Sequence, residues 1–220
     1  MTVSLNPFDV VRQFEAALCE YTGAKYAVTT NSCTSALLIA VACCDQILMA
    51  RNPSYLLGKG WRIELVPKIE IPKRTYISVP MSIIHAGCRV TFREETWAGG
   101  YQLKPTPVWD FARRFTSGMF VPNTMQCVSF HWQKILGIQQ GGAVLHDNPY
   151  ADEWLRRARF DGRREGIPPN QDDFDMIGWH AYMSPEIAAE GLVRLRFLPK
   201  HNADLPNDPY PDLSLMRIFQ

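Results

Sequence analysis

Hydrophobic residues recur at steps of three and four positions near the start of the chain and predict an amphipathic helix over residues 7–21. Gly23 follows, where a helix ends well in a left-handed C-cap. A short strand-like piece, residues 26–30, leads into hydroxyl and amide side chains at residues 31–35, which begin helices well. The next stretch, residues 36–44, is apolar on nearly all sides. We therefore predict a buried helix there.

Strand-like and helical segments alternate along the rest of the chain. Residues 45–68 contain two glycines and two prolines and predict an irregular connection. After it, the pattern predicts an apolar piece at 69–71, a helix at 78–85, strands at 88–92, 107–110, 126–130 and 143–145, and helices at 151–160 and 185–198. This alternation is typical of an α/β fold with a mostly parallel sheet covered on both faces. Residues 199–220 form a Pro-rich tail that we expect to wrap over the surface.

Charge and composition narrow the function classes. The 220 residues include 23 Lys and Arg against 22 Asp and Glu, a net charge of +1, so no strong field attracts nucleic acid or an anionic membrane. With 46% hydrophobic residues, the chain can bury the core of one large domain. The N-terminus lacks a signal-peptide pattern, and the longest apolar run, residues 36–44, is too short to span a bilayer. We expect a soluble cytoplasmic protein without nucleic-acid or membrane partners.

The six cysteines show neither a CxxC pair nor metal-ligand spacing with histidine. Four of them lie inside apolar runs, where a reduced thiol packs as a small hydrophobic group. We therefore expect neither disulfide bonds nor a zinc site.

Three polar positions are candidates for chemistry, although each has an ordinary structural reading. Lys134 follows an apolar strand and precedes Gly141-Gly142, but most lysines at such positions lie on the surface. Asp110 ends a predicted strand, as many turn residues do. Residues 31–35 are good helix caps, and the free N–H groups of the same helix start would bind a phosphate.

The order of the motifs is more informative than any one of them. Tyr26-Ala27-Val28 and residues 32–37 are similar to a "YAV…SGTAAL" segment. Residues 72–76 match "P-x-x-T-[FWY]", and residues 109–113 are similar to "EDAAQ".

Two further matches complete the series. Ser129-Phe130-His131 with Lys134, followed by Gly141-Gly142, matches "SFHxxK" and its downstream glycine pair, and residues 178–192 are similar to "GxNxRMSExQAAIGL". In this order the motifs resemble the large domain of the DegT/DnrJ/EryC1/StrS family of pyridoxal-phosphate (PLP) sugar aminotransferases, over about residues 7–198.

The resemblance implies a fold type I PLP-dependent transferase large domain, like that of aspartate aminotransferase, over residues 1–198. Lys134 would form the Schiff base with the cofactor aldehyde, since burial beside cationic or apolar neighbours lowers a lysine pKa. Asp110 would keep the pyridine nitrogen protonated. Tyr76 would stack on the ring. The full set of implied cofactor-binding residues is Cys33, Thr34, Ser35, Tyr76, Asp110, Ala112, Arg113, Ser129, His131, Lys134 and His180.

The chain also departs from the family pattern. Cys33 stands at the glycine of "SGT", Arg113 at the glutamine of "EDAAQ" and His180 at the asparagine of "GxN". The small C-terminal domain of full members is not visible in the sequence, so an active enzyme needs residues 45–68 or the tail to cover the cofactor. Five arginines between positions 156 and 164 predict a solvated helix face, with recognition of a nucleotide diphosphate as the less favoured reading.

The resemblance implies an aminotransferase of polysaccharide biosynthesis that acts on a nucleotide-linked keto-sugar, takes the amino group from glutamate and shares its active sites in a homodimer. The alternative is a catalytically impaired or accessory relative that keeps the scaffold, with or without PLP. A PLP-dependent sugar dehydratase is a third reading, which Lys134 opposes because such relatives carry histidine there.

Overall fold

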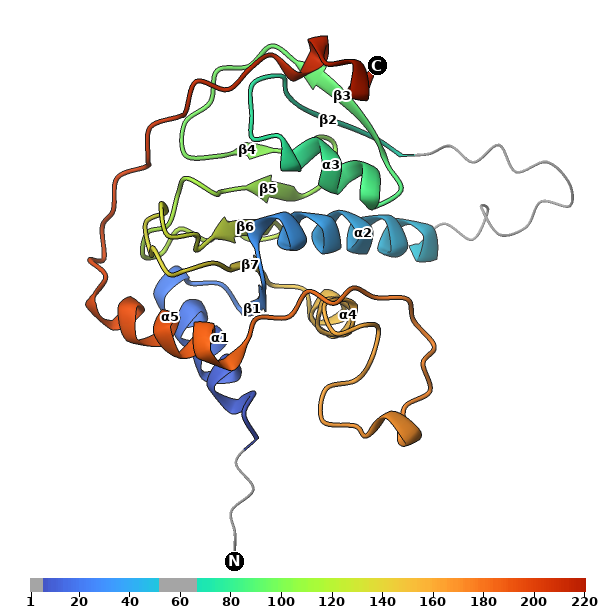
Figure 1. Cartoon of the computed structure of the whole chain (residues 1–220), viewed down its shortest axis with the longest axis vertical. Coiled ribbons are helices and arrows are strands. Elements are labelled where there is room, and N and C mark those ends of the chain that lie inside the picture. The colour runs from blue at the N-terminus through green and yellow to red at the C-terminus, as the bar shows by residue number, and fades with distance from the viewer. Residues whose placement is uncertain (1–5, 52–66) are drawn as a thin grey trace, which may run out of the picture.

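Helices and strands alternate in the computed structural model, which describes residues 6–51 and 67–220 (Figure 1). In chain order they are α1 (Asp9–Thr22), β1 (Tyr26–Thr30), α2 (Cys33–Arg51), β2 (Lys68–Pro72), α3 (Ser78–His85), β3 (Arg89–Arg93), β4 (Tyr101–Gln102), β5 (Val108–Asp110), β6 (Met125–Ser129), β7 (Gly142–His146), α4 (Pro149–Ala158), η2 (Pro169–Gln171), α5 (Pro185–Phe197), η3 (Leu213–Leu215) and η4 (Arg217–Phe219). The predicted caps are present. Gly23 is left-handed with φ of 82°, and the Ser184 hydroxyl accepts the N–H of Ile187 at the start of α5.

Five strands form one mixed sheet in the order β1-β7-β6-β5-β4, and β2 pairs with β3 in a separate parallel pair. Strand β7 runs antiparallel to both of its neighbours, β1 and β6, and β4 runs antiparallel to β5, whereas β5 and β6 are parallel. The α/β class is confirmed, but the sheet is mixed rather than mostly parallel. A parallel connection between neighbouring strands needs a crossover, usually a helix, and residues 130–141 between β6 and β7 contain none.

The sheet lies between two layers of helices, because successive strand residues point to opposite faces. Val28, Cys127 and Val144 pack with α2, α3 and α4 in one core cluster. Their chain neighbours Ala27, Val128 and Leu145 pack with α1 and α5 in the other. The predicted cover on both faces is thus present, and the apolar helix α2 is buried over residues 36–44 as expected, except at the half-buried Leu38.

The irregular connection predicted from residue 45 begins later than expected. Helix α2 continues to Arg51, so the prediction is wrong for residues 45–51, and the rest of that segment up to residue 66 lies outside the described residues. No proline or glycine occurs between residues 45 and 51, and the first proline, at position 53, disfavours helix for the residue before it.

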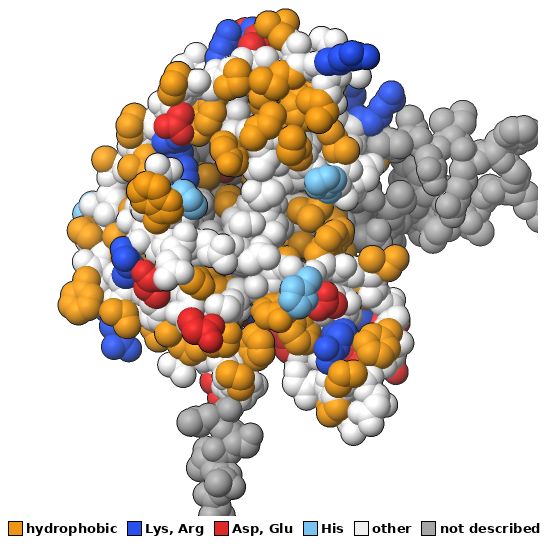
Figure 2. Space-filling model, viewed as in Figure 1, with side chains coloured by type: hydrophobic (Ala, Val, Ile, Leu, Met, Phe, Trp, Pro, Cys, Tyr) orange, Lys and Arg blue, Asp and Glu red, His pale blue; other side chains and the backbone are white. Residues whose placement is uncertain are grey.

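Figure 2 shows one face of the molecule, on which basic and acidic side chains are scattered and interspersed rather than gathered into a continuous basic surface. Hydrophobic side chains gather at the top of this view, over the part of Figure 1 that contains β2, β3 and the C-terminal end. Within the described residues, no helix is both long and apolar enough to cross a membrane.

The C-terminal tail, residues 199–220, runs back along the sheet from α5 and ends beside β3 (Figure 1). Its backbone is attached at several points. The carbonyl of Lys200 accepts the N–H of Ser117 at 2.8 Å, and the N–H of Leu205 donates to the Arg113 carbonyl at 2.9 Å. Leu213 is fully buried, and its N–H donates to the carbonyl of Lys73 at 2.8 Å.

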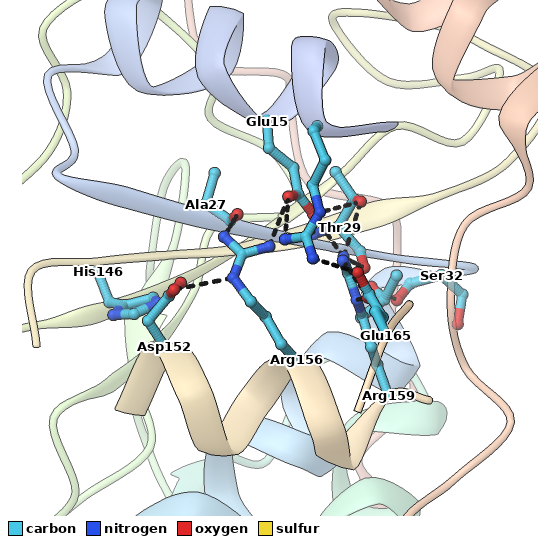
Figure 3. A network of polar contacts seen from close by, with 11 residues as sticks. Glu15, Ala27, Thr29, Ser32, His146, Asp152, Arg156, Arg159 and Glu165 are labelled. Atoms are coloured by element: carbon cyan, nitrogen blue, oxygen red, sulfur yellow. Dashed lines mark hydrogen bonds and ion pairs between the residues drawn. The ribbon is translucent and has the colours of Figure 1, made fainter. Parts of the chain in front are cut away.

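A buried ion cluster fastens α1 to β1 and to the end of α4 (Figure 3). Glu15 of α1 binds the guanidinium of Arg159 at 2.5 Å and that of Arg156 at 2.7 Å. The same carboxylate accepts the N–H of Thr29 at 3.0 Å and its hydroxyl at 2.9 Å. Burial raises the pKa of Glu15, but the charges of Arg159 and Arg156 outweigh that effect and lower the pKa to about 2.

This cluster corrects the expected role of the arginine-rich segment. Arg159 is only 1% exposed and cannot belong to a solvated helix face. Four of the five arginines pair with carboxylates of this chain: Arg156 with Glu15 and Asp152, Arg157 with Asp175, Arg159 with Glu15 and Glu165, and Arg164 with Asp172. Their charges serve the fold rather than a diphosphate.

We predict that Glu15→Gln lowers the free energy of unfolding by about 3–5 kcal/mol, because it leaves the buried guanidinium of Arg159 and the partly buried one of Arg156 without their shared carboxylate. Urea denaturation at pH 7 measures the change. Glu20→Gln, at an exposed position of the same helix, is the matched control and should change stability by less than about 0.5 kcal/mol.

The effect of Glu15→Gln should also depend on pH. The folded-state pKa of Glu15, about 2, lies below its ordinary value of 4.5, so its contribution is complete above that value and is lost as the pH falls towards 2. The two proteins should therefore converge in stability on acidification. An equal difference at pH 3 and pH 7 would contradict the assigned role.

Candidate active site

One cavity of about 300 Å³ lies at the edge of the sheet where β1, β5 and β6 end. These three strands point the same way, because β1 and β6 are both antiparallel to β7 and β5 is parallel to β6. Carboxyl ends of parallel strands meet at one edge, where open α/β sheets bind ligands. The polar and aromatic lining residues are Asn31, Ser32, Cys33, Thr34, Thr75, Tyr76, Ser78, Trp97, Asp110, Arg113, Ser129, His131, Gln133, Lys134, Gln140, Asp208 and Tyr210.

Asp110, the last residue of β5, is buried and held by two donors. Its Oδ1 accepts the N–H of Ala112 and its Oδ2 accepts the hydroxyl of Tyr101, each at 2.9 Å. Burial raises the pKa of Asp110, while these two donors and the charges of Lys134 and Arg113 restrain the rise. The carboxyl group is therefore fixed in place and more basic than a surface aspartate.

Lys134 lies in the loop after β6, in a turn where its N–H donates to the His131 carbonyl at 2.7 Å. Its side chain is half-buried and lines the same cavity as Asp110. Burial, and then the neighbouring charge of Arg113, lower the pKa of Lys134. A lysine in these surroundings releases its proton more readily than a surface lysine, so its amine is a better nucleophile at neutral pH.

The start of α2 forms a second wall of the cavity. The Ser32 hydroxyl caps the helix by accepting the N–H of Ser35 at 3.1 Å, and the Thr34 hydroxyl lies 2.9 Å from that of Ser78. Burial raises the pKa of the Cys33 thiol well above its usual range, so Cys33 brings no negative charge to the helix start. The helix therefore keeps its capacity to hold an anion.

Strand β7 approaches this helix start so closely that only glycine fits. A Cβ on Gly142 would lie 2.5 Å from the backbone nitrogen of Cys33. Gly142 of the Gly141-Gly142 pair that marked the motif therefore lets the strand pass directly beside the first turn of α2.

Most of the predicted cofactor-binding residues share this cavity. Nine of the eleven line it, namely Cys33, Thr34, Tyr76, Asp110, Ala112, Arg113, Ser129, His131 and Lys134. Ser35 does not, because its hydroxyl binds the side chain of Asn31 at 2.7 Å. His180 does not either: its side chain is exposed and pairs with Asp161 at 3.0 Å. The side chain of His180 thus does not line the cavity of its own chain, although its carbonyl accepts the side-chain N–H of Asn31 at 3.5 Å.

Sequence reasoning did not identify Tyr101 or the two tail residues of the cavity, Asp208 and Tyr210. Tyr101 stands opposite Asp110 in the antiparallel β4–β5 pair, and its hydroxyl also lies 2.5 Å from that of Thr75. A two-residue strand gives no periodic signal, so this register was not readable from the sequence. Asp208 and Tyr210 belong to the tail, which the prolines marked only as irregular.

Comparison with known proteins agrees with this arrangement. The model of the DegT/DnrJ/EryC1/StrS aminotransferase family matches residues 4–49. No curated protein matches the chain in sequence. Similar solved structures include AtS13 from Actinomadura melliaura, with 19% identity over 86% of this chain and 60% of that protein and a TM-score of 0.69. DesV from S. venezuelae, solved with a ketimine intermediate, has 20% identity, coverage of 88% and 57% and a TM-score of 0.63.

The chain has the fold of these aminotransferases. The resemblance seen in the motifs is confirmed by the family match and by this likeness. NtdA from Bacillus subtilis, solved with bound PMP, is also similar, with 15% identity over 86% of this chain and 48% of that protein and a TM-score of 0.64. The chain spans about half to three fifths of the length of these neighbours.

The residues of the cavity fit pyridoxal phosphate. The cavity offers the amine of Lys134, whose pKa is lowered, for the aldehyde, and the buried carboxyl group of Asp110 for the ring nitrogen. The start of α2, with the hydroxyls of Thr34 and Ser129, offers donors for the phosphate. Tyr76 and Trp97 offer flat surfaces for the ring.

We predict that Tyr101→Phe raises the pKa of Asp110 further, because the buried carboxylate loses the hydroxyl that donates to its Oδ2 and keeps the N–H of Ala112. Stability should fall by about 1–3 kcal/mol at neutral pH and recover on acidification, since a carboxyl whose folded-state pKa is raised destabilises only its ionised form. Carboxyl-carbon NMR titration of the aspartates measures the shift, with Asp110→Asn to assign the resonance. Tyr150→Phe, at an exposed tyrosine, is the control. An unchanged Asp110 titration would show that the hydroxyl contributes nothing.

Proposed function

We propose that the chain is a PLP-dependent aminotransferase that acts on a nucleotide-linked keto-sugar with glutamate as the amino donor. The observation that carries the proposal is that Lys134 and Asp110, from the ends of neighbouring parallel strands, line one cavity beside the start of α2. Their pKa values shift in opposite directions, that of Lys134 down and that of Asp110 up. Such paired shifts mark groups suited to exchanging protons near neutral pH.

Pyridoxal phosphate supplies an aldehyde for the amine and a ring that takes up the electron pair left when a proton leaves the amino-bearing carbon. The chain's residues do the rest. Lys134 Nζ would hold the cofactor through its aldehyde carbon, with loss of water, and, when free again, would move the proton from the amino-bearing carbon to the cofactor. Asp110, whose carboxyl group is held by the Tyr101 hydroxyl and the Ala112 N–H, would keep a proton at the ring nitrogen. The Thr34 and Ser129 hydroxyls and the start of α2 would hold the phosphate.

The proposal of a sugar substrate is based on the solved structures to which the chain is similar. PseC from Helicobacter pylori is described as an aminotransferase of pseudoaminic acid biosynthesis, and CalS13 from Micromonospora echinospora as a sugar aminotransferase. We place the reaction in the cytoplasm, in polysaccharide biosynthesis. We further propose a homodimer with shared active sites, in which the exposed side chain of His180 reaches the partner's cavity. Sedimentation equilibrium decides this point, since a monomeric active enzyme would contradict it.

Lys134→Ala should abolish covalent attachment of pyridoxal phosphate, because Lys134 is the lysine that lines the described cavity. Borohydride reduction of the mixed protein and cofactor, followed by peptide mass spectrometry, locates the attached group. Lys200→Ala, which removes an exposed lysine, should leave attachment unchanged. Attachment that persists in Lys134→Ala would overturn the assignment.

Asp110→Asn should leave attachment to Lys134 intact but slow conversion of bound cofactor by glutamate about 10²–10³-fold, because an amide cannot hold the ring proton. Single-turnover absorbance measures the rate. An unchanged rate would make Asp110 a structural residue. A protein that binds the cofactor at Lys134 yet never reacts with glutamate would instead be the accessory relative.

A further inference from the structure

The C-terminal tail is attached by three aspartates spaced four residues apart. Asp204 binds Arg114 at 2.6 Å, Asp208 binds Arg113, and Asp212 binds Lys73 at 2.9 Å. The middle pair differs from the outer two, because Asp208 and Arg113 both line the cavity that also holds Lys134. The tail therefore places one of its own carboxylates in the candidate active site.

Arg113 is held independently of this carboxylate. Its side chain is 7% exposed and donates to the carbonyl of Pro206. Two of its nitrogens, Nη2 and Nε, also donate to the Tyr210 hydroxyl, at 2.9 and 3.2 Å. The guanidinium also lies 5.6 Å from the centre of the Tyr210 ring. Loss of Asp208 would thus leave the guanidinium in place, with N–H groups free for another acceptor.

Asp208, by contrast, is the solvent-exposed member of the pair. Its side chain is 65% exposed, so it can turn into solvent without uncovering the core. A solvated carboxylate of this kind is weakly held, whereas an entering carboxylate can make two parallel bonds to a guanidinium. The arrangement is that of a carboxylate receptor filled by the chain itself.

On these grounds we propose that Arg113 and Tyr210 form the binding site for the carboxylate of the amino donor, which Asp208 occupies in its absence and vacates when the donor enters. The proposal rests on the proposed function, since a transaminase must hold an amino acid with its amino-bearing carbon near Lys134. Arg113 lies close enough to Lys134 for its charge to lower that lysine's pKa. A donor carboxylate on Arg113 thus lies beside the reactive amine.

Succinate, a dicarboxylate without an amino group, tests the site apart from the chemistry. We would titrate it calorimetrically into the full chain without cofactor. Asp208→Asn should tighten succinate binding by about 10-fold, because the internal competitor for the guanidinium is removed. Asp204→Asn breaks the neighbouring tail contact outside the cavity and should leave affinity unchanged. Arg113→Lys should weaken binding at least about 10-fold, because lysine lacks the planar fork.

The outcomes separate the hypotheses. Equal affinity of wild type and Asp208→Asn for succinate, or no binding by either protein, would overturn the proposal. A variant Asp208→Asn that binds inorganic phosphate more tightly than wild type does, but succinate no more tightly, would also overturn it. Dimethyl succinate, which has no charge, should not bind. Attachment of pyridoxal phosphate to Lys134 is measured separately, so a failed receptor and a failed aminotransferase give different results.

Discussion

The close approach of β7 to the first turn of α2 is the contact on which the candidate site depends. A Cβ at Gly142 would lie 2.5 Å from the Cys33 nitrogen, so a side chain there would push the strand and the helix apart. Strand β7 also fixes the direction of its two neighbours, since it is antiparallel to both β1 and β6. With β7 in place, β1 and β6 end at the same edge of the sheet. Strand β5, which lies beside β6, ends there too. Lys134, Asp110 and the start of α2 are brought together by this geometry rather than by nearness in sequence.

Two buried carboxylates illustrate how the same fold separates structural charge from chemical charge. Glu15 lies between Arg156 and Arg159, and their charges lower its pKa to about 2 despite burial. Asp110 is bound by neutral donors, Tyr101 and the Ala112 N–H, and burial raises its pKa. Full ion pairing keeps Glu15 charged and inert across the physiological range. Asp110 is instead left able to share a proton, as a carboxyl group that faces a basic ring nitrogen must be.

Much of the local structure follows from the sequence, because caps and apolar periodicity act over a few residues. The start of α5 at Ser184 and Pro185 and the end of α1 at Gly23 are examples. The motif order likewise places Lys134 and Asp110 correctly in one cavity.

The features that could not be predicted from the sequence depend on contacts between residues far apart in the chain. The burial of Arg159 depends on Glu15, 144 positions away, and charge patterning alone reads such arginines as a surface. Tyr101 reaches Asp110 through the register of a two-residue strand. The tail carries no periodicity, and its position is set by ion pairs with Arg113, Arg114 and Lys73 and by backbone hydrogen bonds to Arg113 and Lys73. The direction of β7 could have been read from the missing helix between β6 and β7, a signal that the βα alternation obscured.

The central claim is that the cavity binds pyridoxal phosphate through Lys134 and uses it to take an amino group. The most direct measurement is the absorbance spectrum of the full chain with added cofactor, before and after L-glutamate. The account predicts a protein-dependent visible band at roughly 410–430 nm, absent from Lys134→Ala, that glutamate bleaches as the cofactor accepts the amino group. A spectrum that stays the sum of free cofactor and protein at every concentration would contradict it.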